Sequence, residues 1–317
     1  MTDSAELVTT LVQLREALTN VALPLDVPEA ETHRTMRTEM LGQLEDYVLP
    51  RLIQIDAPLL TVVGGSTGAG KSTLVNSLVG TKVTEPGVLR PTTRSPVLVH
   101  NPADADWFDR SRILPQLART TGATGDPGAL QLVPIETMPL GLAILDAPDI
   151  DSVEERNRTL AAELLAAADL WLFVTSAARY ADQVPWDFLK AAAERSTSVA
   201  VVLDRTPPEA VDEVSSHLAR MLTARGLRDS PLFTVTEGTP DENGMLPAES
   251  VQEIRGWLDL LAADAEARAG VVKKTLDGAV RSLARRSYVV ADASAEQAVA
   301  LGRLRDDVDR AYDDAIT

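Results

Sequence analysis

The chain of 317 residues contains no cysteine. Disulfide bonds, thiolate nucleophiles and cysteine-ligated zinc are therefore excluded. Aromatic residues make up only 4% of the chain, so the core has to be built mainly from Ala, Leu and Val, a composition that favours helices and parallel strands. The histidines, His33, His100 and His217, lie far apart in the sequence. We therefore expect no histidine metal cluster.

Basic charge and long apolar runs are also scarce. The chain has 30 basic and 47 acidic residues, a net charge of −17, which repels nucleic acid and anionic lipid, so no nucleic-acid partner is expected. No stretch reaches the roughly 18 uninterrupted apolar residues of a membrane span. Residues 1–18 also lack the basic and apolar segments of a secretory signal. We expect a soluble, cytoplasmic protein.

The composition is otherwise that of a globular protein, with 45% hydrophobic and 24% charged residues, and the length suits about two domains. Short apolar runs alternate with segments of helical spacing, the pattern of an α/β domain with a mainly parallel sheet. The apolar runs are 58–65, 95–100, 130–135, 141–146, 169–175, 198–204 and 231–236. The helical patterns are 71–79, 153–168, 185–195 and 208–225.

Helical patterns also flank this region. Residues 3–23 repeat apolar side chains at helical spacing, and a second helix is predicted from about Glu29 to Ile55, with a kink at Pro50. We predict an N-terminal helical segment over 1–56, an α/β domain over 57–245 and a C-terminal helical segment over 246–317. The two helical segments are expected to pack together, because each carries an apolar stripe. The helical pattern continues to the last residue, so we expect a longer protein.

The decisive motif is GSTGAGKST at residues 65–73, which matches G-x-x-x-x-G-K-[ST]. It follows a buried strand and opens a helix, so its backbone N–H groups and the helix N-terminus are expected to bind phosphate groups. Lys71 is predicted to bridge the β- and γ-phosphates, Ser72 to ligate Mg²⁺ and Thr73 to reach the α-phosphate. The predicted nucleotide-binding residues of the loop are Gly65, Ser66, Thr67, Gly68, Ala69, Gly70, Lys71, Ser72 and Thr73.

A second metal ligand is expected at the end of another buried strand. Asp146 directly follows the apolar run of residues 141–145. Its carboxylate is predicted to hold Mg²⁺, through water.

With these segments the chain resembles P-loop GTPases of the translation-factor-related class, and specifically bacterial dynamin-like and Era-like members, over roughly residues 58–236. The resemblance is carried by GKSTLVNSLVG at 70–80, LRPTTRSPV at 89–97 and LDAPD at 145–149. It implies a G domain with a helical neck that binds GTP or GDP with Mg²⁺ and hydrolyses GTP. It also implies that Thr93, or Thr92, senses the γ-phosphate and ligates Mg²⁺. Thr67 would stand at the position that tunes hydrolysis, beside Lys71.

The chain departs from that family at two places. Asp149 replaces the glycine that offers its N–H to the γ-phosphate, and remains a candidate nucleotide-binding residue. The base-reading motif [NT]-K-x-D is replaced by residues 204–207, DRTP. Asp204 and Arg205 are candidates for contacts with the base, while Pro207 cannot accept hydrogen bonds from guanine. The choice of guanine therefore rests on the resemblance.

The resemblance further implies homodimerisation through the G domain, movement of the helical neck, and work at membranes such as remodelling or division. Association with the membrane would occur through regions beyond the chain. Two alternatives remain. The first is a nucleotide-gated binding module that hardly hydrolyses GTP. The second is a P-loop ATPase or kinase, which leaves the RPTT and NSLVG segments unexplained.

Overall fold

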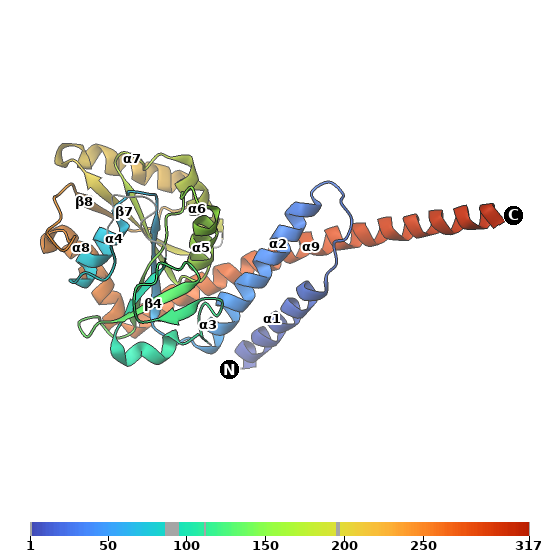
Figure 1. The fold of residues 1–317 in the computed structure, drawn as a ribbon, viewed down its shortest axis with the longest axis horizontal. Helices are drawn as coiled ribbons and strands as arrows, with labels where there is room; N and C mark the ends of the chain where they lie inside the picture. Colours follow the sequence, from blue (N-terminus) through green and yellow to red (C-terminus); the bar gives the residue numbers. More distant parts are fainter. Residues whose placement is uncertain (1, 86–94, 111, 195–196, 317) are drawn as a thin grey trace. The chain divides into compact units, whose positions relative to one another are not determined.

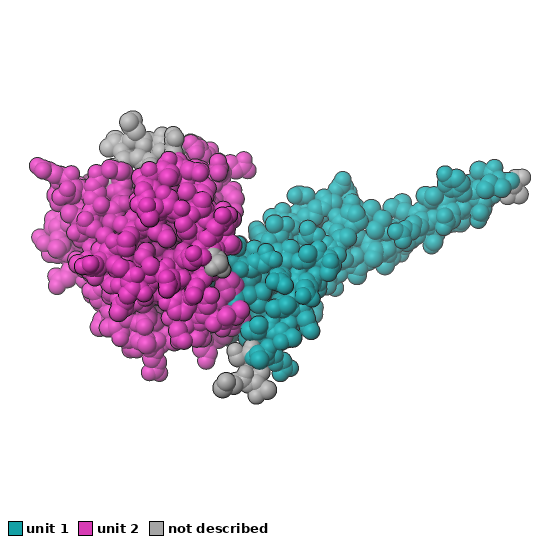
Figure 2. Space-filling view, turned by 60° about the horizontal axis from the view of Figure 1, so that its bottom comes forward, with its two compact units in different colours: residues 1–49, 280–317 teal, residues 50–279 magenta. Residues whose placement is uncertain are grey.

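A computed structural model describes residues 2–85, 95–110, 112–194 and 197–316. The chain divides into two compact units, coloured separately in Figure 2: residues 1–49 with 280–317 form unit 1, and residues 50–279 form unit 2. These boundaries differ from the predicted ones near residues 56 and 246. The difference arises because two helical stretches that follow residue 246 pack with the sheet of unit 2.

Unit 2 contains the mainly parallel sheet that the sequence predicts. In the described part of the chain it has the strand order β3-β4-β2-β5-β1-β6-β7-β8. Every neighbouring pair is parallel except β2 and β5. The strands are β1 (Leu59–Gly65), β2 (Val97–His100), β3 (Ala118–Thr120), β4 (Ala129–Pro134), β5 (Leu142–Asp146), β6 (Leu170–Ser176), β7 (Ser198–Thr206) and β8 (Leu232–Thr236).

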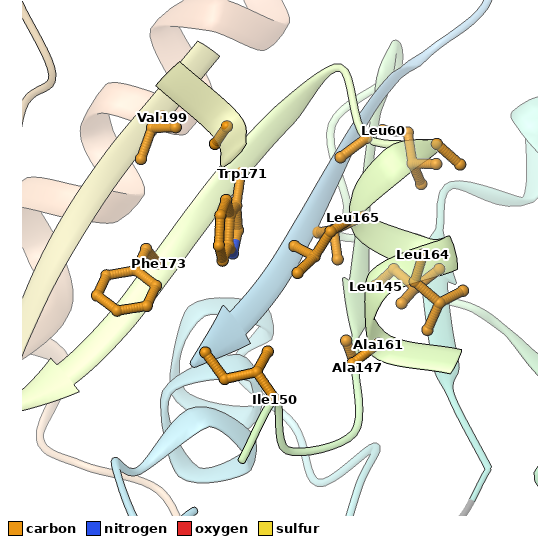
Figure 3. Packing of buried hydrophobic residues seen from close by; sticks show 14 of the residues in the cluster. Leu60, Leu145, Ala147, Ile150, Ala161, Leu164, Leu165, Trp171, Phe173 and Val199 are labelled. Atoms are coloured by element: carbon orange, nitrogen blue, oxygen red, sulfur yellow. The ribbon is translucent and has the colours of Figure 1, made fainter. Parts of the chain in front are cut away.

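Helices cover both faces of this sheet, which explains why the central strands β5, β1 and β6 are buried along their whole length. The helices of unit 2 include α4 (Lys71–Val79), α5 (Glu155–Ala166), α6 (Gln183–Glu194), α7 (Val211–Ala224) and α8 (Ala248–Ala263), with short 3₁₀ helices η2 (Pro102–Phe108) and η3 (Pro208–Ala210). Helices α5, α6 and α7 share one core with one face of the sheet. Figure 3 shows part of it, with Leu165 of α5 beside Trp171 of β6. Helices α4 and α8 pack against each other and against β5 (Figure 1).

A buried ion pair lies where β6 begins. Arg51 Nε is 2.9 Å from Asp169 Oδ1, and both side chains are less than a tenth exposed. The other carboxylate oxygen of Asp169 accepts the backbone N–H of Leu60 at 2.9 Å. Thr275, in helix α9 (Ala265–Ile316), donates its hydroxyl to the carbonyl of Asp169 at 3.0 Å. This network joins the chain entering β1, the start of β6 and the first part of α9.

Unit 1 consists of helices from both ends of the sequence. They are α1 (Thr2–Asn20), α2 (Ala30–Gln43), a π-helical turn η1 (Leu44–Val48) and the part of α9 from residue 280 onward. The backbone N–H of Leu25 donates to Gln297 Oε1 at 2.9 Å, and Arg286 pairs with Glu39. The terminal segments therefore pack together within this unit.

Just before Pro50, where the sequence predicts a kink, the helix type changes locally. Proline lacks an N–H and its ring clashes with the carbonyl four residues earlier. Here the turn η1 directly precedes α3 (Leu49–Ile53), and the N–H of Leu49 donates to the carbonyl of Leu44, five residues back. The wider turn lets the chain remain helical through Pro50.

Among the helices that the structure describes, none has the length and apolarity needed to cross a membrane.

Candidate nucleotide-binding site

The phosphate loop lies between the end of β1 and the start of α4, as the motif predicts. Gly70 adopts a backbone φ of 94°, a conformation that residues with a Cβ atom rarely adopt. A Cβ at this position would also lie 1.9 Å from Asp204 Oδ2, at the end of the more distant strand β7. Glycine is therefore required at residue 70 both by the turn and by the close approach of Asp204.

Lys71, the first residue of α4, reaches back across the loop. Its Nζ donates to the carbonyls of Gly65 and Ser66 at 3.1 and 3.0 Å and forms an ion pair with Asp149. The Lys71 side chain is 6% exposed and that of Asp149 is 19% exposed. Two residues predicted from separate motifs, Lys71 and Asp149, thus lie in direct contact.

Ser72 and Asp146, the two residues predicted to hold a metal ion, also lie together. Ser72 Oγ donates to Asp146 Oδ2 at 2.8 Å, and Thr84 Oγ1 donates to the same oxygen at 2.9 Å. Burial raises the pKa of the Asp146 carboxyl, against the opposing effects of the Ser72 hydroxyl and the Lys71 charge. Asp146 lies near Ser72 because β1 and β5 are neighbouring strands. Asp146 pairs with Val63, near the end of β1 that leads into the phosphate loop.

This cluster fits a small divalent cation. Asp146 Oδ1 is fully buried and has no hydrogen-bond partner among the described residues. Hydroxyl and carboxylate oxygens are the ligands that Mg²⁺ accepts in proteins. The remaining predicted ligand, Thr93, and its neighbour Thr92 lie outside the described residues.

Asn76, in the middle of α4, organises the segment that delivers Thr84. Its Oδ1 accepts the backbone N–H groups of Val83 and Thr84 at 2.9 and 3.1 Å, and its Nδ2 donates to the carbonyl of Thr84 at 2.9 Å. Asn76 is completely buried. Asn76 belongs to the family-like segment 70–80, which predicts no role for it, and no motif in the sequence marks Thr84.

Thr67 is held by two residues that no sequence motif marks, Asp151 and Arg179. Its backbone N–H and its hydroxyl both donate to Asp151 Oδ1 at 2.6 Å, and its carbonyl accepts Arg179 Nη1 at 2.8 Å. Arg179 also pairs with Asp151 at 2.9 Å. Burial of Asp151 opposes its ionisation, but the two hydrogen bonds from Thr67 and the Arg179 charge outweigh burial and lower its pKa. No sequence pattern links these three residues, because the contacts join separate loops.

Most of the other loop residues have buried side chains or a left-handed backbone conformation. Ser66 and Ala69 are completely buried, and Gly68 has a positive φ of 76°. Thr73 is buried in the first turn of α4, and its carbonyl accepts the Ser77 hydroxyl at 2.7 Å.

The candidate base-reading residues lie next to the loop. Asp204 is 3% exposed, and its Oδ1 accepts the backbone N–H of Arg205 at 2.8 Å. Burial raises the pKa of Asp204 to about 6, against the opposing effect of Arg205. Arg205 has a positive φ of 50° and an exposed side chain. The Asp204 carboxylate therefore faces the phosphate loop, and Arg205 is the member of the pair that reaches solvent.

The region that contains these residues matches a known protein family. Residues 61–205 match the model of the dynamin family. This segment is similar to the dynamin family. It includes the phosphate loop, Asp146, Asp149, Asp151, Arg179 and Asp204.

The chain is also similar to individual proteins. A probable transmembrane GTPase, FZO-like and chloroplastic, from Arabidopsis thaliana is 25% identical over 153 residues, which is 48% of this chain and 16% of the relative. The chain thus spans about one sixth of that protein.

Two solved structures are similar to the chain at low identity. A chain of an oligomerised bacterial dynamin pair is 16% identical with a TM-score of 0.48, and the match covers 92% of this chain and 56% of that one. The Era protein of Aquifex aeolicus, bound to GDP and AlF₄⁻, is 18% identical with a TM-score of 0.41. The match covers 63% of this chain and 56% of the Era chain. The chain therefore spans little more than half of each.

Proposed function

We propose that the chain binds a guanine nucleotide together with Mg²⁺ and hydrolyses GTP to GDP and phosphate. The observation that carries this proposal is the meeting of Ser72 with Asp146 beside Lys71, at the neighbouring ends of β1 and β5. A complete phosphate loop next to a buried hydroxyl–carboxylate cluster supports a triphosphate–metal site. The match of residues 61–205 to the dynamin family supports GTP as the triphosphate.

In this proposal each side chain has a defined task. Lys71 donates hydrogen bonds to β- and γ-phosphate oxygens, and the N–H groups of the loop and of the first turn of α4 bind the remaining oxygens. Ser72 and Asp146 would hold Mg²⁺, which supplies charge neutralisation at the β- and γ-phosphate oxygens when bound. A water molecule attacks the γ-phosphate in line with the bond that breaks. Thr67 and Thr93 are the proposed residues for tuning this attack.

Base recognition is proposed for Arg205, with Asp204 as its support. The Arg205 side chain is exposed at the edge of the phosphate loop, and its planar guanidinium is suited to stacking on a base. Asp204 fixes the backbone of Arg205 through the N–H that it accepts. Pro207 offers no carboxylate to guanine, so the proposed selectivity for guanine over adenine is supported by the match to the dynamin family and is tested first.

The experiment is a calorimetric titration with GDP, a non-hydrolysable GTP analogue, ADP and an ATP analogue, each with Mg²⁺. We expect guanine nucleotides to bind and the Lys71→Ala variant to lose this binding. Lys190→Ala is the matched control, because Lys190 is an exposed lysine on α6, outside the site. Equal binding of adenine and guanine nucleotides would contradict the proposed base selectivity. Equal binding by both lysine variants would contradict the proposed site.

We also propose that GTP drives homodimerisation through unit 2 and changes the arrangement of the helices of unit 1, as part of work at a membrane. These steps come from the dynamin family and from γ-phosphate switches in general. Light scattering with the GTP analogue tests the first step. A molecular mass that stays monomeric at all protein concentrations used would contradict it.

A second candidate function is a nucleotide-gated binding module with very slow hydrolysis. The ion pair between Asp149 and Lys71 favours it, because a carboxylate beside this lysine opposes a triphosphate. Tight nucleotide binding with phosphate release no faster than that of Lys71→Ala would support the module over the GTPase.

A further inference from the structure

The segment that follows β5 carries two acidic side chains onto the phosphate loop. Asp149 pairs with Lys71, and Asp151 accepts both the N–H and the hydroxyl of Thr67. Between them Ile150 is completely buried, and its N–H donates to the carbonyl of Gly65 at 3.3 Å. The segment is therefore attached to the loop through three consecutive residues.

The contacts of Lys71 leave no free donor. An ammonium group has three N–H bonds and no acceptor. The Lys71 Nζ contacts three acceptors: the carbonyls of Gly65 and Ser66 and the carboxylate of Asp149. The two carbonyls belong to the loop itself, whereas Asp149 is brought by a separate segment. A phosphate oxygen that approaches Lys71 from outside the loop thus has to compete with Asp149.

Asp149 cannot easily leave this position. Its neighbour Asp151 forms an ion pair with Arg179, and Arg179 also donates to the carbonyl of Thr67. Moving the segment outward would break these contacts and expose Ile150. The Asp149 carboxylate is therefore held against Lys71 by contacts that do not involve Asp149 itself.

We propose that Asp149 takes the place of a terminal phosphate at Lys71, so that the site favours a nucleoside diphosphate over a triphosphate. This inference rests on the proposed function. A diphosphate leaves Asp149 paired with Lys71, whereas the additional phosphate of a triphosphate brings like charges together unless Asp149 is displaced. Asp149 is thus a specificity-determining residue, and displacement of the 149–151 segment is the step that admits the triphosphate.

The test compares the affinities for GDP and for the GTP analogue, at fixed Mg²⁺, in the unmodified protein and in Asp149→Asn. We expect the unmodified protein to bind GDP more tightly. In Asp149→Asn the affinity for the analogue should rise at least about tenfold, while that for GDP changes less than about threefold. Asp149→Ser is the second variant, used if the amide destabilises the segment. Asp229→Asn is the matched control, because Asp229 is an exposed acid paired with Arg228 on the surface.

Two results would overturn the inference. One is an equal change of both affinities, or no change, in folded Asp149→Asn and Asp149→Ser. The other is an unmodified protein that binds the analogue at least as tightly as GDP. Both results leave the proposed function standing, provided that Lys71→Ala abolishes binding. If neither guanine nucleotide binds the unmodified protein more tightly than Lys71→Ala, the proposed function fails, and the inference fails with it.

Discussion

Asn76 holds Thr84 through both ends of its amide: Oδ1 accepts the N–H of Thr84 at 3.1 Å, and Nδ2 donates to its carbonyl at 2.9 Å. A buried side chain of α4 thereby sets the position of the Thr84 hydroxyl on Asp146. The proposed metal ligand Asp146 thus depends on a residue that does not contact it.

We predict that Asn76→Ala lowers the free energy of unfolding by about 1–3 kcal/mol, because buried backbone groups of Val83 and Thr84 lose their partners. It should also weaken Mg²⁺-dependent nucleotide binding. Urea unfolding and calorimetric titration measure the two effects. Asn243→Ala, on an exposed turn, is the control and should leave both unchanged. A stability loss with unaltered metal dependence would show that Asn76 supports only the fold.

Gly70→Ala should be far more damaging than the same change at another glycine with positive φ. Gly226 has a φ of 82°, similar to the 94° of Gly70, but a Cβ there meets nothing within 4 Å. Gly226→Ala should therefore cost only about 1–2 kcal/mol, the strain of the left-handed conformation. Gly70→Ala carries the same strain and also displaces Asp204, so it should cost more and abolish nucleotide binding. Equal losses of unfolding free energy in the two variants would rule out the steric role of Asp204.

Asp204→Asn should stabilise the protein above pH 6. The pKa of Asp204 is raised to about 6 in the folded state by burial, from an ordinary value of 3.8. The stability that its protonated form contributes is fully present below pH 3.8 and is lost as the pH rises through about 6. Asparagine stays neutral, so at pH 8 the free energy of unfolding of the variant should exceed that of the unmodified protein by up to about 3 kcal/mol. Thermal unfolding across pH 4 to 8 should show a gain that vanishes toward the acid end, and a gain independent of pH would contradict the assignment.

The Arg51–Asp169 pair should be essential for the stability of unit 2. Arg51→Met leaves the buried Asp169 carboxylate without its cationic partner, which typically costs about 3–5 kcal/mol. Arg228→Met is the matched control, since Arg228 pairs with Asp229 on the surface with both side chains more than 70% exposed. That change should have almost no effect. Denaturant unfolding distinguishes the two, and a loss below about 1 kcal/mol in Arg51→Met would refute the role of the pair.

Much of the fold follows from local sequence pattern. The apolar run at 58–65 and the motif after it predict the strand–loop–helix unit of β1 and α4, because both elements are encoded by adjacent residues. Asp146 is recognisable for the same reason, as the end of an apolar run. The π turn before Pro50 is not, since its pattern is that of an ordinary helix.

The parts of the site that were missed depend on contacts between distant loops. Thr84 and Arg179 stand in segments without a motif, and only the packing of α4 and β6 brings them to Asp146 and Thr67. Asp149 is visible in the sequence as a departure from a glycine, but its partner Lys71 follows only from the three-dimensional arrangement. Thr93 stays a prediction, because it lies outside the described residues.

Gly64, one residue before the loop motif, has a consequence for spectroscopy. A Cβ there would lie 2.7 Å from Trp171 Nε1, so the indole rests directly on the strand that carries the phosphate loop. Trp171 is 2% exposed, and its N–H has no hydrogen-bond partner among the described residues. We therefore expect Trp171, one of four tryptophans in the chain, to emit toward the blue edge of the tryptophan emission. The protein thus carries, without any added label, an optical reporter of β1 at the base of the nucleotide site.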